Sequence, residues 1–134
     1  MNFIVASAAI VFALGSLHLL YTFRGPKLLP RDRSVRAQME GSALVITRET
    51  TVWKAWIGFN ASHSLGAMLF GAVYADLAWS HPDVLRASPF LLAVGAALLL
   101  AYAWLGRRYW FSVPFRGLVV AAVLYGVGLA TLIA

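Results

Sequence analysis

The sequence predicts an all-α integral membrane protein, an up-down-up-down bundle of four spanning helices with a short interfacial helix between the first and second spans. Three observations predict this class. The chain is 61% hydrophobic and only 12% charged, whereas an ordinary soluble domain is about a quarter charged. Four apolar runs are each long enough to cross a bilayer, and the basic residues collect in two of the connections. A chain of 134 residues then forms a single four-span membrane domain.

The four apolar runs match the thickness of a bilayer, whose hydrocarbon core of about 30 Å takes roughly 20 helical residues. None of them alternates between apolar and polar residues, so helices and not barrel strands are expected. The second run is long enough to tilt or to project from the bilayer. Pro89 and Pro114 stand where the third and fourth helices start, a position that tolerates proline. We expect the spans at about 2–23, 51–79, 89–106 and 114–134.

The connections between the spans predict the topology. Those at 80–88 and 107–113 are short, so consecutive spans should be antiparallel neighbours. Ten of the eleven Lys and Arg residues fall on one side of a four-span chain, and only Arg86 falls on the other, beside Asp76 and Asp83. By the positive-inside rule the ten face the cytoplasm, which puts both termini on the periplasmic side of a bacterial inner membrane. The ten are Arg24, Lys27, Arg31, Arg33, Arg36, Arg48, Lys54, Arg107, Arg108 and Arg116.

The connection at 24–54 is long enough to hold structure of its own. Pro26 and Pro30 exclude a continuation of the first helix. From Arg31 onward an apolar residue recurs at helical spacing, which predicts a short amphipathic helix lying on the inner leaflet. A solvated basic loop is the alternative, because Gly41 weakens a helix. The recurring residues are Val35, Met39, Ser42 or Ala43, and Ile46.

Polar side chains lie inside the first two spans. The stretch GSLHLLYTF carries His18 and Tyr21, and WIGFNASHSLG carries Asn60 and His63. At about 1.5 Å per residue all four fall in the cytoplasmic half of the bilayer, where they would converge on one polar pocket. Ionisable groups inside a membrane are functional candidates, and this pocket would take a substrate, a proton or a lipid headgroup. Interhelical hydrogen bonding is the structural alternative.

Two histidines on separate helices raise a third possibility, ligation of haem b or of a metal ion, with help from Glu49. The sequence lacks the paired Glu-x-x-His ligands of di-metal bundles, so no metal site is predicted at His18 and His63. The absence of cysteine excludes disulfides, thioether-bound haem and thiolate-bound zinc or iron–sulfur clusters. No cofactor is therefore predicted.

Small residues recur at spacings of four or seven positions in three spans, which predicts close helix contacts. Gly58, Ser62 and Gly66 form such a stripe on a face offset from Asn60 and His63. A role in dimerisation is the alternative for this stripe. The later spans offer Ala93, Ala97 and Ala101, and then Gly117, Ala121 and Gly128.

The stretch TRETTVWKAW precedes the second span and allows two interpretations. In the structural one, Arg48 pairs with Glu49, or Glu49 starts the helix favourably at its positive end, and a threonine at 47, 50 or 51 caps it. In the functional one, Arg48 and Glu49 close the cytoplasmic mouth of the polar pocket, and Arg48 grips an anionic headgroup.

The motifs GSLHLLYTFRGPK and TRETTVWKAWIGFNASHSLG resemble those of a family of small uncharacterised bacterial four-span membrane proteins that carry GSxHLxYTF and WxGFNxSHSxG. The resemblance covers mainly residues 15–66. It implies the four-span architecture and marks His18, Asn60 and His63 as candidate positions, but it implies no reaction.

Two functional hypotheses follow. In the first, the chain is a non-catalytic subunit or binding module that packs against other membrane subunits, or against itself, in a respiratory, photosynthetic or transport-related assembly. In the second, it is a small membrane enzyme or carrier that binds a lipophilic substrate, haem or a metal at the histidine and asparagine pocket. No acid–base pair or activated nucleophile can be assigned, which favours the first. The net charge is +6, and the basic residues that produce it flank the apolar spans, where they would contact anionic lipid. Nucleic acid is therefore not an expected partner.

Overall fold

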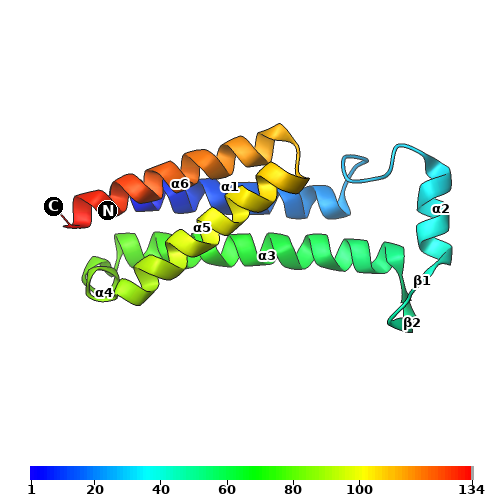
Figure 1. Ribbon diagram of the computed structural model, residues 1–134, viewed down its shortest axis with the longest axis horizontal. Helices are drawn as coiled ribbons and strands as arrows, with labels where there is room; N and C mark the ends of the chain where they lie inside the picture. The colour runs from blue at the N-terminus through cyan, green and yellow to red at the C-terminus, as the bar shows by residue number, and fades with distance from the viewer. Residues whose placement is uncertain (134) are drawn as a thin grey trace. The chain divides into compact units, whose positions relative to one another are not determined.

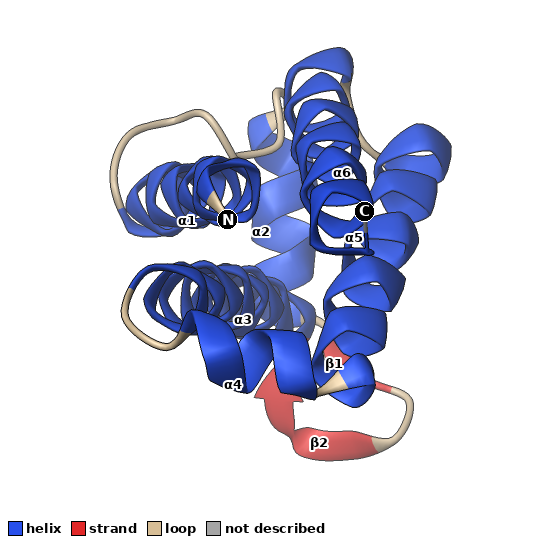
Figure 2. Cartoon of the chain, turned by 90° about the vertical axis from the view of Figure 1, so that its left-hand side faces the viewer, coloured by secondary structure: helices blue, strands red, loops and turns tan. Residues whose placement is uncertain are grey.

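The computed structural model describes residues 1–133, which form six α-helices and one two-stranded hairpin (Figures 1 and 2). The predicted helical class is therefore correct apart from the hairpin. The helices are α1 (Asn2–Phe23), α2 (Arg33–Gly41), α3 (Val52–Trp79), α4 (Pro82–Ala87), α5 (Pro89–Tyr109) and α6 (Ser112–Ile133). The strands are β1 (Ala43–Leu44) and β2 (Thr47–Thr51).

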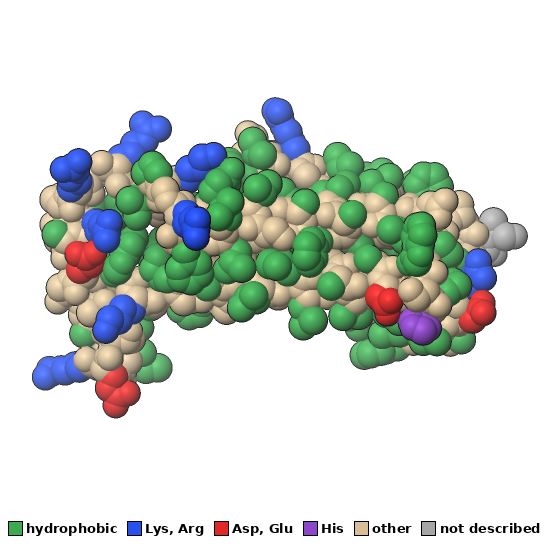
Figure 3. All heavy atoms as spheres, turned by 180° about the vertical axis from the view of Figure 1, so that it is seen from behind, with side chains coloured by type: hydrophobic (Ala, Val, Ile, Leu, Met, Phe, Trp, Pro, Cys, Tyr) green, Lys and Arg blue, Asp and Glu red, His purple; other side chains and the backbone are tan. Residues whose placement is uncertain are grey.

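Within the described residues, three helices are long and apolar enough to cross a membrane, namely α1, α5 and α6. Figure 3 shows apolar side chains along the helices, with charged side chains at helix ends and in connections. The predicted second span, α3, is 28 residues long but is not among the three. Its apolar run is interrupted by Asn60, Ser62, His63 and Ser64, which lowers its hydropathy. The sequence and the structure together therefore indicate a helical membrane protein.

Proline residues and a capping serine mark the starts of the later helices. Pro89 occupies the first turn of α5, and the Ser88 hydroxyl accepts a hydrogen bond from the Leu91 amide at 3.3 Å. Helix α5 continues to Tyr109, three residues beyond the predicted end, and α6 begins at Ser112. The two helices pack as antiparallel neighbours (Figure 1). The predicted loop at 80–88 instead contains the short helix α4, which has Pro82 in its first turn.

The chain divides into two compact units, and α1 and α3 contribute to both. Unit 1 comprises Met1–Leu14 and Ala67–Ala134, and unit 2 comprises Gly15–Gly66. The buried apolar core lies in unit 1. Its members are Ile4, Ala8, Val11, Ala67, Phe70, Tyr74, Ala78, Leu85, Leu99, Leu118, Ala121 and Tyr125.

Helix α6 packs against α1 in unit 1 through the small residues predicted for it. A Cβ on Gly117 would lie 2.9 Å from the Leu14 side chain, and one on Gly128 would lie 2.5 Å from Ile4. Between these positions the Ser7 hydroxyl donates to the Ala121 carbonyl at 2.7 Å. The contact between Ile4 and Gly128 puts the start of α1 and the end of α6 at the same end of this unit (Figure 1).

Helix α5 uses a different face from the predicted one. Ala93, Ala97 and Ala101 are exposed, so the predicted alanine contact face is wrong. The buried residues of α5 are Gly95, Leu99 and Gly106. Gly95 receives the ring of Tyr125, because glycine admits a large side chain close to the helix backbone.

Two buried tyrosines hold α5 to its neighbours. The Tyr74 hydroxyl donates to the Leu91 carbonyl at 2.6 Å, and the Tyr125 hydroxyl donates to the Leu92 carbonyl at 3.1 Å. Tyr74 therefore belongs to the core of unit 1. Tyr125, which is 2% exposed, likewise belongs to this core.

Unit 2 contains α2 and the hairpin, which Figure 1 places next to each other in the chain. Asp32 caps α2 by accepting from the Ser34 amide at 2.8 Å. The helix predicted from Arg31 is present, but its predicted continuation to Ile46 is wrong, because α2 ends at Gly41. The following residues are rich in β-branched side chains, which favour strands. Ala43 pairs with Thr51 and Leu44 with Thr47 in an antiparallel ladder.

Candidate functional site

His18 and Asn60, one on α1 and one on α3, form a direct hydrogen bond in unit 2. The His18 Nε2 atom lies 2.9 Å from the Asn60 Oδ1 atom. The Asn60 Nδ2 atom donates to the Trp56 carbonyl at 2.7 Å, which fixes the amide with its oxygen toward His18. An amide oxygen can only accept a hydrogen bond. The proton of the bond is therefore on His18 Nε2, which donates the hydrogen bond to Asn60.

His63 completes a cluster of three polar side chains. Its ring meets that of His18 edge to face, with the two centroids 5.5 Å apart and the planes at 88°. Both rings are partly buried. The structure therefore brings together three of the residues that the sequence predicted at similar depth, namely His18, Asn60 and His63. We refer to these three residues as the imidazole–amide cluster.

Two hydroxyl groups line the helix backbone beside the cluster. Thr22 donates to the His18 carbonyl and Ser64 donates to the Asn60 carbonyl, each at 2.8 Å. Ser64 is completely buried and Thr22 is 8% exposed. Ser64 was not predicted as a member of the site. Its position four residues after Asn60 was the available signal, because a serine at that spacing can bond the preceding turn.

Tyr21 lies outside the cluster. The Lys27 ammonium group sits over its ring, 4.1 Å from the centroid, which is a cation–π contact. Lys27 lies four residues beyond the end of α1. Tyr21 therefore links the first helix to the connection that follows it.

Arg48 and Glu49 are neighbours in β2, and both are exposed. Within residues 1–133 no ion pair joins them, and neither makes a hydrogen bond or ion pair with the imidazole–amide cluster. Adjacent residues of a strand point to opposite faces, so the predicted pairing is wrong. Glu49 is also outside the first turn of α3, so its predicted role at the helix start is wrong.

Thr51 fulfils one of the predicted capping roles at the start of α3. Its hydroxyl accepts from the Lys54 amide at 3.3 Å. The Thr47 hydroxyl instead accepts from the Glu49 amide at 3.1 Å, inside the hairpin. The beginning of α3 is therefore fixed by a threonine at the end of β2.

The small-residue stripe of α3 faces outward. Gly58, Ser62 and Gly66 are all exposed, and a Cβ on Gly58 would meet no atom within 4 Å. The contact between α1 and α3 in unit 1 is made at Gly71 instead, where a Cβ would lie 2.7 Å from the Ala8 carbonyl oxygen. The stripe therefore does not serve as a packing surface within the chain.

The cluster does not fit a haem held between its two histidines. Such a haem takes one imidazole on each side of a flat macrocycle, whereas these rings touch edge to face and His18 Nε2 is bonded to Asn60. Within residues 1–133 no group of three or more His, Cys, Asp or Glu side chains is placed to hold a metal ion. The cluster therefore consists of one interhelical hydrogen bond, between His18 and Asn60, and of the His63 imidazole packed edge to face on the His18 ring.

The chain was compared with protein-family models, with curated proteins and with solved structures, and none of the three comparisons gives a match.

Proposed function

We propose that the chain is a non-catalytic four-span membrane subunit that packs against another membrane protein, or a second copy of itself, through the exposed stripe Gly58, Ser62 and Gly66. The observation that carries this proposal is the division of the small residues into two sets. Gly71, Gly117 and Gly128 are closely approached by side chains or backbone of their own unit, whereas Gly58 meets no atom. A small-xxx-small stripe lets a helix from outside approach in the same way.

The proposal takes α3 as the fourth span. At about 1.5 Å per residue its 28 residues extend about 42 Å, more than the hydrocarbon core of about 30 Å. Its polar side chains have partners that lower the cost of placing them in lipid. Asn60 bonds Trp56 and His18, Ser62 donates to the Phe59 carbonyl at 3.1 Å, and Ser64 donates to the Asn60 carbonyl.

The direction of insertion follows from the charges. With four spans, the basic residues of 24–54 and of 107–116 share one side, which the positive-inside rule makes the cytoplasm of a bacterial inner membrane. The partner is a membrane-spanning helix that offers its own small or flat face, since the stripe carries no charge. A respiratory, photosynthetic or transport-related assembly would supply such a helix.

The experiment is extraction of the chain from its native membranes in a mild detergent, followed by native electrophoresis. We expect it to migrate in a larger assembly, and we expect a Gly58→Leu, Ser62→Leu double variant to leave that assembly while staying folded. The matched control is Ala93→Leu and Ala97→Leu on the exposed alanine face of α5. Migration of the wild type as a monomer, or equal loss with the control, would contradict the proposal.

A second candidate function is favoured by the contact between His18 and His63. Two imidazoles from different helices, 5.5 Å apart, would hydrogen-bond a carbonyl or hydroxyl group of a lipophilic substrate or carried molecule. Organic extraction of the purified chain and mass spectrometry would detect such a molecule. Its retention by the wild type and loss from His63→Leu would favour a carrier or enzyme over a subunit, and its absence from the wild type would remove this candidate.

A further inference from the structure

The connection that follows α1 forms an open hollow with a basic rim. The hollow has a volume of about 640 Å³ and is built within unit 2. Three arginines and one glutamate give its lining a positive balance. It is lined by Pro26, Leu29, Pro30, Arg31, Arg33, Arg36 and Glu40.

The backbone that forms the hollow is fixed by a glycine turn and by two hydrogen bonds. Gly25 has a φ of 79°, a left-handed conformation that suits glycine and turns the chain sharply after α1. The Leu29 amide then donates to the Pro26 carbonyl at 3.1 Å. Asp32 caps α2 by accepting from the Ser34 amide. The first turn of α2 is therefore occupied by a carboxylate, and any anion in the hollow must be bound by side chains.

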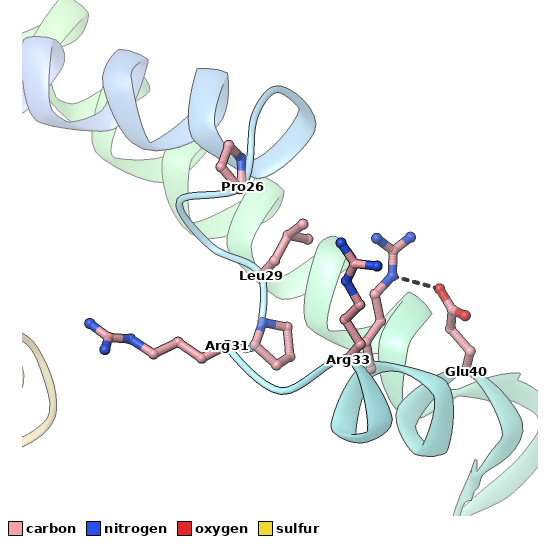
Figure 4. A pocket seen from close by; sticks show the side chains of 7 residues that line it. Pro26, Leu29, Arg31, Arg33 and Glu40 are labelled. Atoms are coloured by element: carbon pink, nitrogen blue, oxygen red, sulfur yellow. Dashed lines mark hydrogen bonds and ion pairs between the residues drawn. The ribbon is translucent and has the colours of Figure 1, made fainter.

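Two arginines of α2 have different surroundings. The Arg36 Nε atom donates to Glu40 at 2.8 Å, and its guanidinium carbon lies 4.8 Å from the centroid of the Trp53 ring. Arg33 is exposed, and within residues 1–133 it makes no hydrogen bond or ion pair. Figure 4 shows Arg33 beside the arginine that bonds Glu40, with Leu29 turned toward them, while Arg31 points away. Arg33 thus has its full set of donors available next to a fixed second guanidinium.

We propose that this hollow binds the phosphate headgroup of an acidic phospholipid of the bilayer, with Arg33 as the principal contact. Guanidinium groups bind phosphate oxygens in bidentate fashion. Leu29 is an apolar residue that is 37% exposed, and it offers a surface for the first part of an acyl chain. The hollow begins three residues after the end of α1 at Phe23, so the chain itself places it at a membrane boundary.

The hollow favours a lipid over a free anion because its lining combines apolar groups with basic ones. Pro26, Leu29 and Pro30 supply apolar surface, and the arginines supply the charge. Trp53 beside Arg36 and Tyr21 beneath Lys27 are aromatic residues of the kind that settle at headgroup level. A free phosphate would use the charge alone and would leave this apolar surface in water.

The test is native mass spectrometry of the full chain in mild detergent, titrated with phosphatidylglycerol or with phosphatidylcholine of the same acyl chains. We expect phosphatidylglycerol to be retained more tightly, and Arg33→Gln to weaken its retention about fivefold or more. The matched control is Lys54→Gln, an exposed basic residue of α3 in the same unit but outside the hollow. Circular dichroism checks that both variants keep the wild-type helix content.

Each other result would overturn the proposal. Equal retention by Arg33→Gln and the wild type would show that the hollow does not hold the lipid. Equal weakening by Lys54→Gln would show attraction by net charge without a site. A third arm adds inorganic phosphate alone at millimolar concentration, and displacement of the lipid by it with equal strength would identify a free anion as the ligand.

Discussion

The imidazole of His18 donates through Nε2 to the Oδ1 atom of Asn60, 2.9 Å away, and so joins α1 to α3 by a side-chain hydrogen bond. The Asn60 amide cannot turn away easily, because its Nδ2 atom is bonded to the Trp56 carbonyl one turn earlier. Interhelical bonds of this kind contribute about 0.6 kcal/mol on average in membrane proteins, and up to about 1.7 kcal/mol. The bond is therefore a modest but directional link.

We expect Asn60→Ala to destabilise the chain by about 1 kcal/mol, because the His18 Nε2–H group loses its acceptor in a partly buried place. Unfolding by a denaturing detergent in mixed micelles measures the effect. Ser62→Ala is the control, since Ser62 is exposed and bonds only within its own turn. A double-mutant cycle with His18→Ala should give a coupling energy of about 0.6–1.7 kcal/mol. Strict additivity would mean that the two residues do not interact.

The proximity of His18, Asn60 and His63 could be predicted from the sequence, but their contacts could not. Their positions along the first two predicted spans suggested a similar depth for all three, and hence a shared pocket. Which atoms meet depends on the rotation of α1 and α3 about their axes, and neither helix has a pronounced apolar face that would set this rotation. Ser64 was missed for a different reason: its hydroxyl bonds the Asn60 carbonyl within α3, and the spacing of four residues allows that bond without requiring it.

The glycines of α3 illustrate a second limit. The sequence contains a Gly58, Ser62, Gly66 stripe and a separate Gly71, and spacing alone favoured the stripe for packing. Gly71 makes the close contact with Ala8 and Phe12 instead. A glycine in a sequence indicates only that another helix could approach closely at that position. Which helix approaches it, if any, is known only from the three-dimensional structure.

We expect Gly71→Leu to destabilise the chain by about 1–3 kcal/mol, whereas Gly58→Leu in the isolated chain should not. A side chain at Gly71 meets the Ala8 carbonyl oxygen and the Phe12 Cβ, each at 2.7 Å, and overpacking of this kind costs about 1–3 kcal/mol. At Gly58 there is open space, and a leucine improves helix propensity. The same micelle unfolding measurement compares the two. Equal destabilisation would contradict the assignment of inner and outer faces.

The hairpin could not be predicted by periodicity. Val35, Met39, Ala43 and Ile46 continue a helical spacing across Gly41, but α2 stops there, and Val45 and Ile46 are exposed at the turn of the hairpin. The β-branched residues between Val45 and Val52 were the signal for strands. The uninterrupted apolar runs of α1 and α6, by contrast, fixed both helices to within two residues.

We expect the start of α2 to loosen in acid because of Asp32. The Ser34 backbone amide and then its side chain donate to this carboxylate and hold its pKa below the ordinary value. A lowered folded pKa means that the stabilisation is complete above the unfolded pKa and is lost as the pH falls through the folded value. Amide hydrogen exchange of Arg33–Gly41, measured from pH 6 to pH 3 and corrected for intrinsic rates, should show protection falling. Asp32→Asn keeps an acceptor that does not titrate, so the same fall in that variant would contradict the assignment.

The proposed four-span topology makes a prediction for single cysteines, which can be introduced singly because the chain has none of its own. Val45 is fully exposed at the hairpin, and Val84 is exposed in α4. If α3 crosses the membrane, Val45→Cys should react with an impermeant maleimide only after cytoplasmic access is given, and Val84→Cys should react from the periplasm in intact cells. The three helices that are apolar enough to span include α1 but not α3, so this pair tests the fourth span directly. Labelling of both positions from one side would mean that α3 does not cross, and labelling with the sides exchanged would mean that the charge rule gives the wrong orientation.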